Sequence, residues 1–250
     1  MRHAERDIRS VAEFIAAIRD HAAAEELRWY RGHVSETFRL VPSIARDPDH
    51  LRGELNAIKV FKQMSRPLLE SVPRTEWEWI FLMQHHGAPT RLLDWTENPL
   101  AALFFALEDP PGRFGADPAI IWVMDPVALT AFAGHRNEFP RDLLAFDIDD
   151  KLRGYQPSEV NPKVSKLNPV AGIGPHVSRR MAAQSGTFTV IHAEVTEVDK
   201  VGDGSHIWRL RIPADAKEGL REELRLLRVQ DFTYFPDLDR VAKRIKEDLQ

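Results

Sequence analysis

An uninterrupted apolar segment, Ala119–Met124 (AIIWVM), does most to limit the folds open to this chain of 250 residues. Pro118 and Pro126 stand at either end of the segment. A continuous apolar run of this length between prolines predicts a buried strand, because a half-exposed strand alternates apolar and polar residues. A buried strand needs neighbouring strands, so the chain is expected to build a sheet around it.

Further elements follow from local patterns. Two sequences with the form of a capping box, Ser10–Glu13 and Thr75–Glu78, predict helix starts, and the second helix is expected to end near His86, before Gly87. Asn98-Pro99 predicts another start, with proline in the first turn. Additional helices are predicted over 51–69, 214–227 and 238–249, and strands over 27–31, 187–192 and 205–212. Short extended segments are predicted over 38–41 and 92–96, and long loops over 134–178.

These elements predict one α+β domain over residues 1–250, with a helix-rich first half and a mixed or antiparallel sheet around a central cleft.

The chain has no cysteine, which excludes disulfides, thiolate metal sites and thiol catalysis. Its 34 basic and 38 acidic side chains give a net charge of −4, which argues against a basic footprint over the whole domain and leaves a local basic groove open. The start of the chain lacks the apolar run of a signal peptide and no stretch is long enough to span a bilayer, so we expect a cytoplasmic location and no membrane partner.

The first polar cluster is Tyr30-Arg31-Gly32-His33, at the end of a predicted strand. An arginine placed there can present its planar guanidinium to a phosphate or a carboxylate, and the glycine lets a ligand approach the main chain. The alternative is that Arg31 forms a structural ion pair beside a turn. Spacing alone does not separate the two interpretations.

The second cluster runs from Gln84-His85-His86-Gly87 to Thr96. Adjacent histidines on a helix point about 100° apart, so they do not share a metal, and no metal site is expected. His86 is a candidate general acid or a helix C-terminal cap. Arg91, Asp94 and Thr96 interrupt apolar sequence, and in a strand Asp94 and Thr96 share one face. Asp94 is a candidate catalytic carboxylate; alternatively it caps the next helix or pairs with Arg91.

A third cluster, Arg179–Gly186, precedes a predicted strand. Its Arg180 and Gln184 can bind an anion or can cap a helix. The fourth, Phe235-Pro236-Asp237, places a carboxylate near the start of the last helix, and we interpret it as structural.

In this order, the motifs resemble the FRG domain family, named for a Phe/Tyr-Arg-Gly signature that corresponds here to Tyr30-Arg31-Gly32. The resemblance continues through Leu40–Ser43 with Arg46, and its most specific part is Gln84–Ala106. It also includes Arg180 with Gln184–Thr189, and Phe235–Asp239. It therefore implies a domain core of about residues 10–245.

A more distant resemblance is to folds that transfer ADP-ribose from NAD. Such folds carry an arginine on an early strand, then a strand with hydroxyl residues followed by a helix, and a catalytic glutamate before a late strand. Here Arg31, Thr96 and Gln184 have that layout. The resemblance implies that Arg31 binds the NAD phosphates and Thr96 supports the nicotinamide ribose. Gln184 departs from the pattern, since an amide cannot stabilise an oxocarbenium-like centre by charge, and Asp94 is the expected substitute.

The expected function is that of an NAD-binding ADP-ribosyltransferase-like enzyme or NAD glycohydrolase, acting as a toxin or defence effector. NAD is expected as substrate, with no tightly bound cofactor, and a transferase also needs a protein or nucleic-acid target. One alternative is a non-catalytic module that binds a nucleotide or another anion through Arg31, Arg91 and Arg180. A second is a nucleic-acid-processing enzyme with His86 and Asp94 as acid and base.

Overall fold

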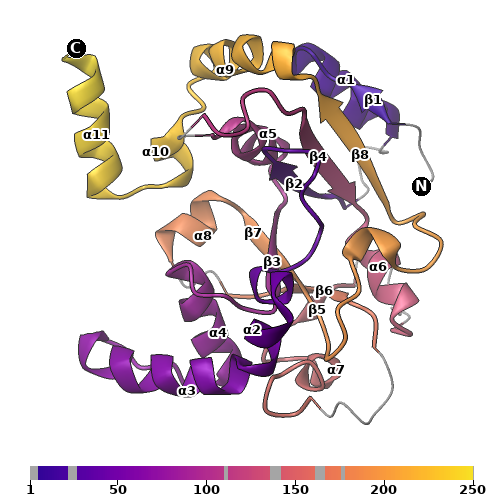
Figure 1. Cartoon of the computed structure of the whole chain (residues 1–250), viewed down its shortest axis with the longest axis vertical. Helices are drawn as coiled ribbons and strands as arrows, with labels where there is room; N and C mark the ends of the chain where they lie inside the picture. The colour runs from indigo at the N-terminus through magenta and orange to yellow at the C-terminus, as the bar shows by residue number, and fades with distance from the viewer. Residues whose placement is uncertain are drawn as a thin grey trace.

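A computed structural model describes residues 5–21, 27–109, 112–135, 142–160, 167–175 and 178–249. The strands form one mixed sheet in the order β1-β8-β4-β2-β3-β7-β6-β5 (Figure 1). Only the outer pairs β1–β8 and β5–β6 are parallel among the strands of this sheet in the described ranges. The strands are β1 (Arg6–Asp7), β2 (Trp29–His33), β3 (Leu92–Thr96), β4 (Ala119–Met124), β5 (Leu144–Ala145), β6 (Val170–Ile173), β7 (Gly186–Val190) and β8 (Ile207–Ile212).

Helices precede and connect these strands, five before β4 and six after it in the described ranges, and together with the mixed sheet they confirm the predicted α+β fold. None of the helices within the described ranges combines the length and apolar character that a membrane span requires. The helices are α1 (Val11–His21), α2 (Pro48–Arg52), α3 (Glu54–Ser65), α4 (Glu76–His85), α5 (Pro99–Leu107), α6 (Pro126–Phe132), α7 (Asp150–Arg153), α8 (Arg179–Ala183), α9 (Lys217–Leu226), α10 (Asp231–Tyr234) and α11 (Leu238–Asp248).

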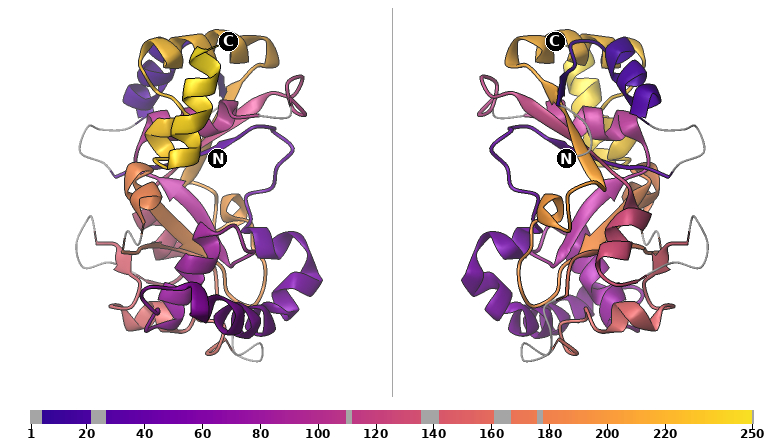
Figure 2. Two further views of the ribbon diagram at one scale, coloured as in Figure 1. Left: turned by 90° about the vertical axis from the view of Figure 1, so that its left-hand side faces the viewer. Right: turned by 90° about the vertical axis from the view of Figure 1, so that its right-hand side faces the viewer.

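The sheet consists of two halves that meet at one residue pair. β2 and β3 are joined only by the pairing of Tyr30 with Thr96, whereas β2 pairs with β4, and β3 with β7, along five residues each. In Figure 2 the upper half carries α1, α9 and α11, and the lower half carries α3 and α4. The two strands diverge beyond Tyr30 and Thr96, and this divergence opens a space between the halves of the sheet.

Apolar clusters hold helices against both halves. Phe14 of α1, Leu103 of α5 and Leu220 of α9 pack on the β2–β4–β8 half. Trp77 and Phe81 of α4 pack on the β3–β7–β6 half, together with a set from the strands and from the segment after β5: Leu92, Phe146, Tyr155, Phe188 and Val190. The predicted strand Ala119–Met124 is β4, buried along its whole length, which confirms the prediction from its sequence.

Several predicted boundaries were wrong. The predicted helix 51–69 is three elements, α2, α3 and a short 3-10 turn at Arg66–Leu68, because Gly53 separates α2 from α3 and Pro67 tightens the end. The segment 38–41, predicted as extended, is not in a strand. The loop-rich region 134–178 also contains the short elements β5, α7 and β6.

Candidate functional site

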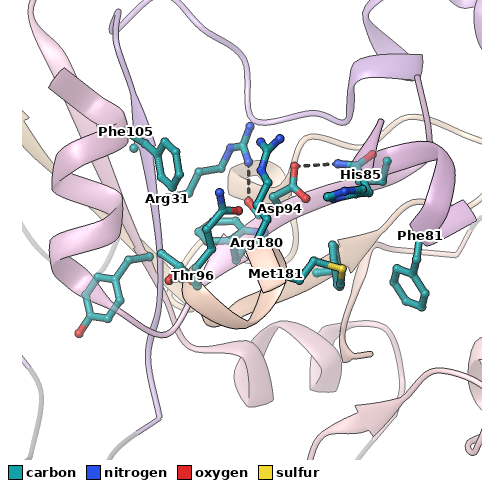
Figure 3. A pocket seen from close by; sticks show the side chains of 14 residues that line it. Arg31, Phe81, His85, Asp94, Thr96, Phe105, Arg180 and Met181 are labelled. Carbon is teal, nitrogen blue, oxygen red and sulfur yellow. Dashed lines mark hydrogen bonds between the residues drawn. The ribbon is translucent and has the colours of Figure 1, made fainter. Parts of the chain in front are cut away.

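A cavity of about 320 Å³ lies where β2 and β3 diverge (Figure 3). Its wall combines charged and amide side chains with aromatic ones. Phe105 and Phe81 lie toward opposite ends of the cavity in the view of Figure 3. The lining residues are Tyr30, Arg31, Gly32, Phe81, Gln84, His85, Asp94, Trp95, Thr96, Phe105, Arg180, Met181, Gln184 and Phe188.

Arg31 spans the opening between the two strands. Its Nη1 donates to the main-chain oxygen of Asp94 at 2.5 Å. A main-chain oxygen at the point where two strands separate lacks a ladder partner, and the guanidinium supplies one. Burial lowers the pKa of Arg31 to about 10, opposed by the charge of Asp94 and assisted by that of Arg46. Arg31 therefore stays cationic at neutral pH, with donors left for a ligand.

His33 holds the guanidinium from the other side. The Nε of Arg31 donates to the Nε2 of His33 at 3.0 Å. Burial, together with the positive charges of Arg31 and Arg46, lowers the pKa of His33 to about 3. The imidazole is therefore neutral at physiological pH, and its Nε2 can accept a hydrogen bond. The position of Arg31 is thus fixed by His33 and Asp94 together.

Asp94 presents its carboxylate to the cavity. Its Oδ2 accepts a hydrogen bond from Nε2 of Gln84 at 2.7 Å, and the hydroxyl of Thr90 donates to the amide oxygen of Gln84. The carboxyl group is open to the cavity but ringed by protein, and this burial raises its pKa, while Arg31, Gln84 and Arg180 oppose the rise. A carboxylate with a raised pKa is a functional-site candidate, since it can exchange a proton more readily near neutral pH.

Thr96 and Gln184 join β3 to the segment before β7. The hydroxyl of Thr96 donates to the main-chain oxygen of Gln184 at 2.5 Å and accepts from the main-chain nitrogen of Asn98 at 2.9 Å. Thr96 thus lines the cavity, but its hydroxyl is occupied within the protein. The side chain of Gln184 donates from Nε2 to the main-chain oxygen of Tyr234 at 3.0 Å.

The α8 side of the cavity contributes a second cation. Arg180 lines the cavity, and its charge acts on Asp94 and on His85. Nδ1 of His85 lies 3.3 Å from the hydroxyl of Ser178, which also caps α8 by accepting from the nitrogen of Met181. Burial lowers the pKa of His85, and His86 and Arg180 add to the effect. Among the residues that the structure describes, neither Arg31 nor Arg180 forms an ion pair with a carboxylate.

In a comparison with known families, the model of the FRG domain matches residues 26–113. This chain carries an FRG domain. The matched range contains β2, β3 and α4, and therefore Arg31, Gln84 and Asp94, whereas Arg180 and Gln184 come from outside it. No curated protein and no solved structure matches the chain.

The glycine of the FRG signature lies within β2 and not after it. Its missing side chain makes room for α5, because a Cβ on Gly32 would overlap the main-chain oxygen of Ala102 and lie 2.5 Å from the nitrogen of Ala106. Gly32 also borders the cavity. The space that its missing side chain leaves is nevertheless taken by the helix, which corrects the expectation that it admits a ligand.

Arg91 is not in the cavity, which corrects its prediction as a ligand-binding residue. It is 3% exposed and forms a bidentate ion pair with Glu54 of α3, from Nε to Oε1 at 2.9 Å and from Nη2 to Oε2. Nη1 donates to the main-chain oxygens of Tyr155 and Ile191 at 2.7 and 3.3 Å. All three guanidinium nitrogens of Arg91 therefore form hydrogen bonds within the protein, and its role is structural. The alternative interpretation, in which Asp94 pairs with Arg91, is also wrong, because Arg91 pairs with Glu54 and Asp94 accepts from Gln84.

His86 is also misplaced in the prediction. It is exposed at the end of α4, where its main-chain nitrogen donates to the oxygen of Leu82 at 3.2 Å. Its neighbour His85 lines the cavity, as does Gln84, which sequence reasoning did not select. The signal was available, since Phe81, Gln84 and His85 follow helical spacing on one face of α4. An exposed His86 outside the cavity removes the proposed acid–base pair with Asp94 of a nucleic-acid-processing enzyme.

The cavity between β2 and β3 thus combines guanidinium groups, one carboxylate, side-chain amides and aromatic walls. Guanidinium groups bind phosphate, carboxylate and amide groups bind sugar hydroxyls, and aromatic rings pack against planar bases. These are the chemical components of a nucleotide.

Proposed function

We propose that this chain binds NAD in the cavity between β2 and β3 and breaks the bond between nicotinamide and ribose. Arg31 and Arg180 bind the diphosphate, and Asp94 faces the reacting ribose. Hydrolysis and transfer to a target share this first step. The proposal therefore covers both an NAD glycohydrolase and an ADP-ribosyltransferase.

The observation that carries the proposal is the meeting of Arg31, Asp94 and Gln184 at one cavity, from three neighbouring segments of the sheet. β2, β3 and β7 are adjacent in the strand order, and all three residues line the same space. The layout of an early arginine, a strand ending in a hydroxyl and a polar residue before a late strand resembles that of folds that transfer ADP-ribose. These three segments are far apart in sequence but adjacent in the sheet, so one ligand in the cavity can contact Arg31, Asp94 and Gln184 together.

The proposed step is heterolysis of the bond between C1′ of the ribose and N1 of nicotinamide. The bonding electron pair leaves with N1, which neutralises the pyridinium charge, and C1′ becomes oxocarbenium-like. The carboxylate of Asp94 stabilises that positive charge, as carboxylates do at glycosidic centres. In hydrolysis a water oxygen then adds to C1′, and Asp94 accepts the proton that the water loses and passes it to solvent. The products are ADP-ribose, nicotinamide and one proton.

A second function, nucleotide binding without cleavage, is favoured by one observation. Gln184 lies before β7, where a carboxylate is expected for transfer chemistry. Its side-chain nitrogen Nε2 already donates a hydrogen bond to the main-chain oxygen of Tyr234. An amide binds a ribose hydroxyl but carries no charge for an oxocarbenium-like centre. If Asp94 does not supply that charge, the cavity binds NAD and leaves it intact.

The test is incubation of the purified protein with NAD and quantification of nicotinamide by chromatography. The proposal predicts nicotinamide release by the natural chain and its loss in Asp94→Asn, which keeps the hydrogen bond from Gln84. An Asp203→Asn variant, altered in an exposed turn, is the matched control and should release nicotinamide at the natural rate. Binding of NAD with no release, in the presence and absence of candidate target proteins, would favour the binding function instead.

A further inference from the structure

The segment around Phe235, which has no role in the proposed reaction, packs on the cavity-lining residue Phe105 and makes two further contacts to the cavity wall. It follows α9 and includes the short helix α10. Tyr234 and Phe235 are 2% and 9% exposed, and they pack on Phe105, with ring centroids 5.8 Å apart in both pairs. Phe105 itself lines the cavity. The C-terminal segment is therefore the layer directly behind this part of the wall.

The first contact is to a cavity cation. The guanidinium carbon of Arg180 lies 4.6 Å from the centre of the Phe235 ring, and that of Arg240 lies 4.7 Å from the same centre. Arg180 sits on α8, a helix of five residues, and has no carboxylate partner among the described residues. This ring contact thus helps to fix where the guanidinium of Arg180 points.

The second contact is to the amide that stands before β7. The main-chain oxygen of Tyr234 accepts the hydrogen bond from Nε2 of Gln184 at 3.0 Å, and the main-chain nitrogen of Gln184 closes α8 by donating to the oxygen of Arg180 at 3.0 Å. Arg180 therefore lies in the first turn of α8, and Gln184 caps the C-terminal end of the same helix. Tyr234 and Phe235 together contact both of these residues, Phe235 through its ring at Arg180 and Tyr234 through its main-chain oxygen at Gln184.

We propose that Phe235 is a positioning residue of the site, which sets the guanidinium of Arg180 for the phosphate of the nucleotide while the carbonyl of Tyr234 sets Gln184. This inference rests on the proposed function for the identity of the ligand. Phe235 does not line the cavity and acts through Arg180. An aliphatic side chain of similar size fills the same space but offers no aromatic face to the cation.

The test compares Phe235→Leu with Phe235→Tyr by calorimetric titration with ADP-ribose. Loss of a cation–π contact of usual strength predicts an affinity about 3- to 30-fold weaker for Phe235→Leu, whereas Phe235→Tyr keeps the ring and the natural affinity. The matched control is Phe114→Leu, which removes another ring that carries an arginine, Arg113 at 5.6 Å, away from the cavity. It should leave the affinity unchanged.

A double-mutant cycle separates positioning from a general packing role. In an Arg180→Gln background, Phe235→Leu should cause no further loss of affinity, because the group that it positions is gone. An equal loss in both backgrounds, or natural affinity in Phe235→Leu, would overturn the proposal.

Amide hydrogen exchange on the ligand-free protein gives a readout that does not depend on the ligand. Phe235→Leu should exchange faster than Phe235→Tyr over residues 179–186, and exchange there at the same rate would also overturn the positioning role. If the natural chain binds neither NAD nor ADP-ribose, the proposed function fails and this exchange comparison alone decides the role of Phe235.

Discussion

Arg31 and Asp94 are held together through the main chain and not by an ion pair. The guanidinium donates to the main-chain oxygen of Asp94 at 2.5 Å, and the carboxylate of Asp94 is bonded to Gln84. The guanidinium of Arg31 and the carboxylate of Asp94 thus face the same cavity. These two side chains, both in the described part of the chain, form no direct salt bridge with each other. A ligand with negative phosphates and a developing positive ribose carbon finds both charges available.

The charge of Asp94 should be needed for chemistry and not for folding. Its pKa is raised by burial, so over the interval between the ordinary and the raised value the folded protein binds more protons than the unfolded one, and this group's contribution to stability falls as pH rises. Asp94→Asn removes that cost, and we expect a melting temperature at pH 7 equal to or above the natural one. A marked fall, measured by calorimetric melting, would make Asp94 a structural carboxylate.

The same raised pKa sets the pH dependence of the proposed reaction. Nicotinamide release should decline on the acid side as Asp94 becomes protonated, at a pH above the value of 3.8 for an unperturbed aspartate. A pH–rate profile of the natural chain measures this. A rate that is flat down to pH 4 in a stable protein would contradict the role.

Arg91 should matter for stability alone. Arg91→Met leaves Glu54 buried without its partner, and breaking a buried ion pair in this way costs about 3–5 kcal/mol. Urea unfolding measures the loss, and the double variant Arg91→Met/Glu54→Leu should recover most of it because no charge remains buried. Weaker NAD binding in a variant of natural stability would return Arg91 to the site.

Gly32→Ala should destabilise the fold. The added methyl group meets the main chain of α5, which cannot move aside as a flexible side chain can. We expect a loss of about 3 kcal/mol or more in the free energy of unfolding, at the upper end of the usual cost of overpacking. Gly154→Ala, where an added Cβ meets nothing within 4 Å, is the control and should change stability little.

His33 should make the protein sensitive to acid. Its pKa is about 3 in the folded state against 6.5 normally, so between these values the unfolded chain binds the additional proton and stability is lost as pH falls. One such group contributes at most about 1.4 kcal/mol per pH unit. His33→Gln keeps an acceptor for Arg31 and should show a shallower dependence of unfolding free energy on pH between 6.5 and 4. An unchanged slope would mean that His33 is protonated in the fold.

Elements with strong local signals were predictable from sequence. The caps at Ser10 and Thr75 each accept a main-chain hydrogen bond three residues on, at 3.1 Å in both cases, and the apolar run of β4 has its predicted bounds. Arg31 was selected because it ends a predicted strand just before a glycine, and Asp94 because it interrupts apolar sequence with a charge. Such signals lie within a few residues of one another.

Features that depend on distant partners were not predictable. Nothing near Arg91 in the sequence shows that Glu54, 37 residues earlier, lies opposite it. The helix phase that places His85 and not His86 at the cavity depends on where α4 ends. The use of Gly32 depends on the approach of α5, a helix that begins 67 residues later. In each case tertiary packing decides the role.

Calorimetric titration of NAD into the natural chain and into Arg31→Lys shows whether the cavity binds NAD and whether the guanidinium of Arg31 takes part. Lysine keeps the charge but cannot bond His33, the oxygen of Asp94 and a phosphate with one planar group. We predict saturable binding by the natural chain, an affinity at least about tenfold weaker for Arg31→Lys, and no change in the control Arg211→Lys, whose guanidinium pairs with Asp7 and Glu36. No binding of NAD by the natural chain would contradict the proposed function, and equal affinity in Arg31→Lys would contradict a role of the Arg31 guanidinium in binding NAD.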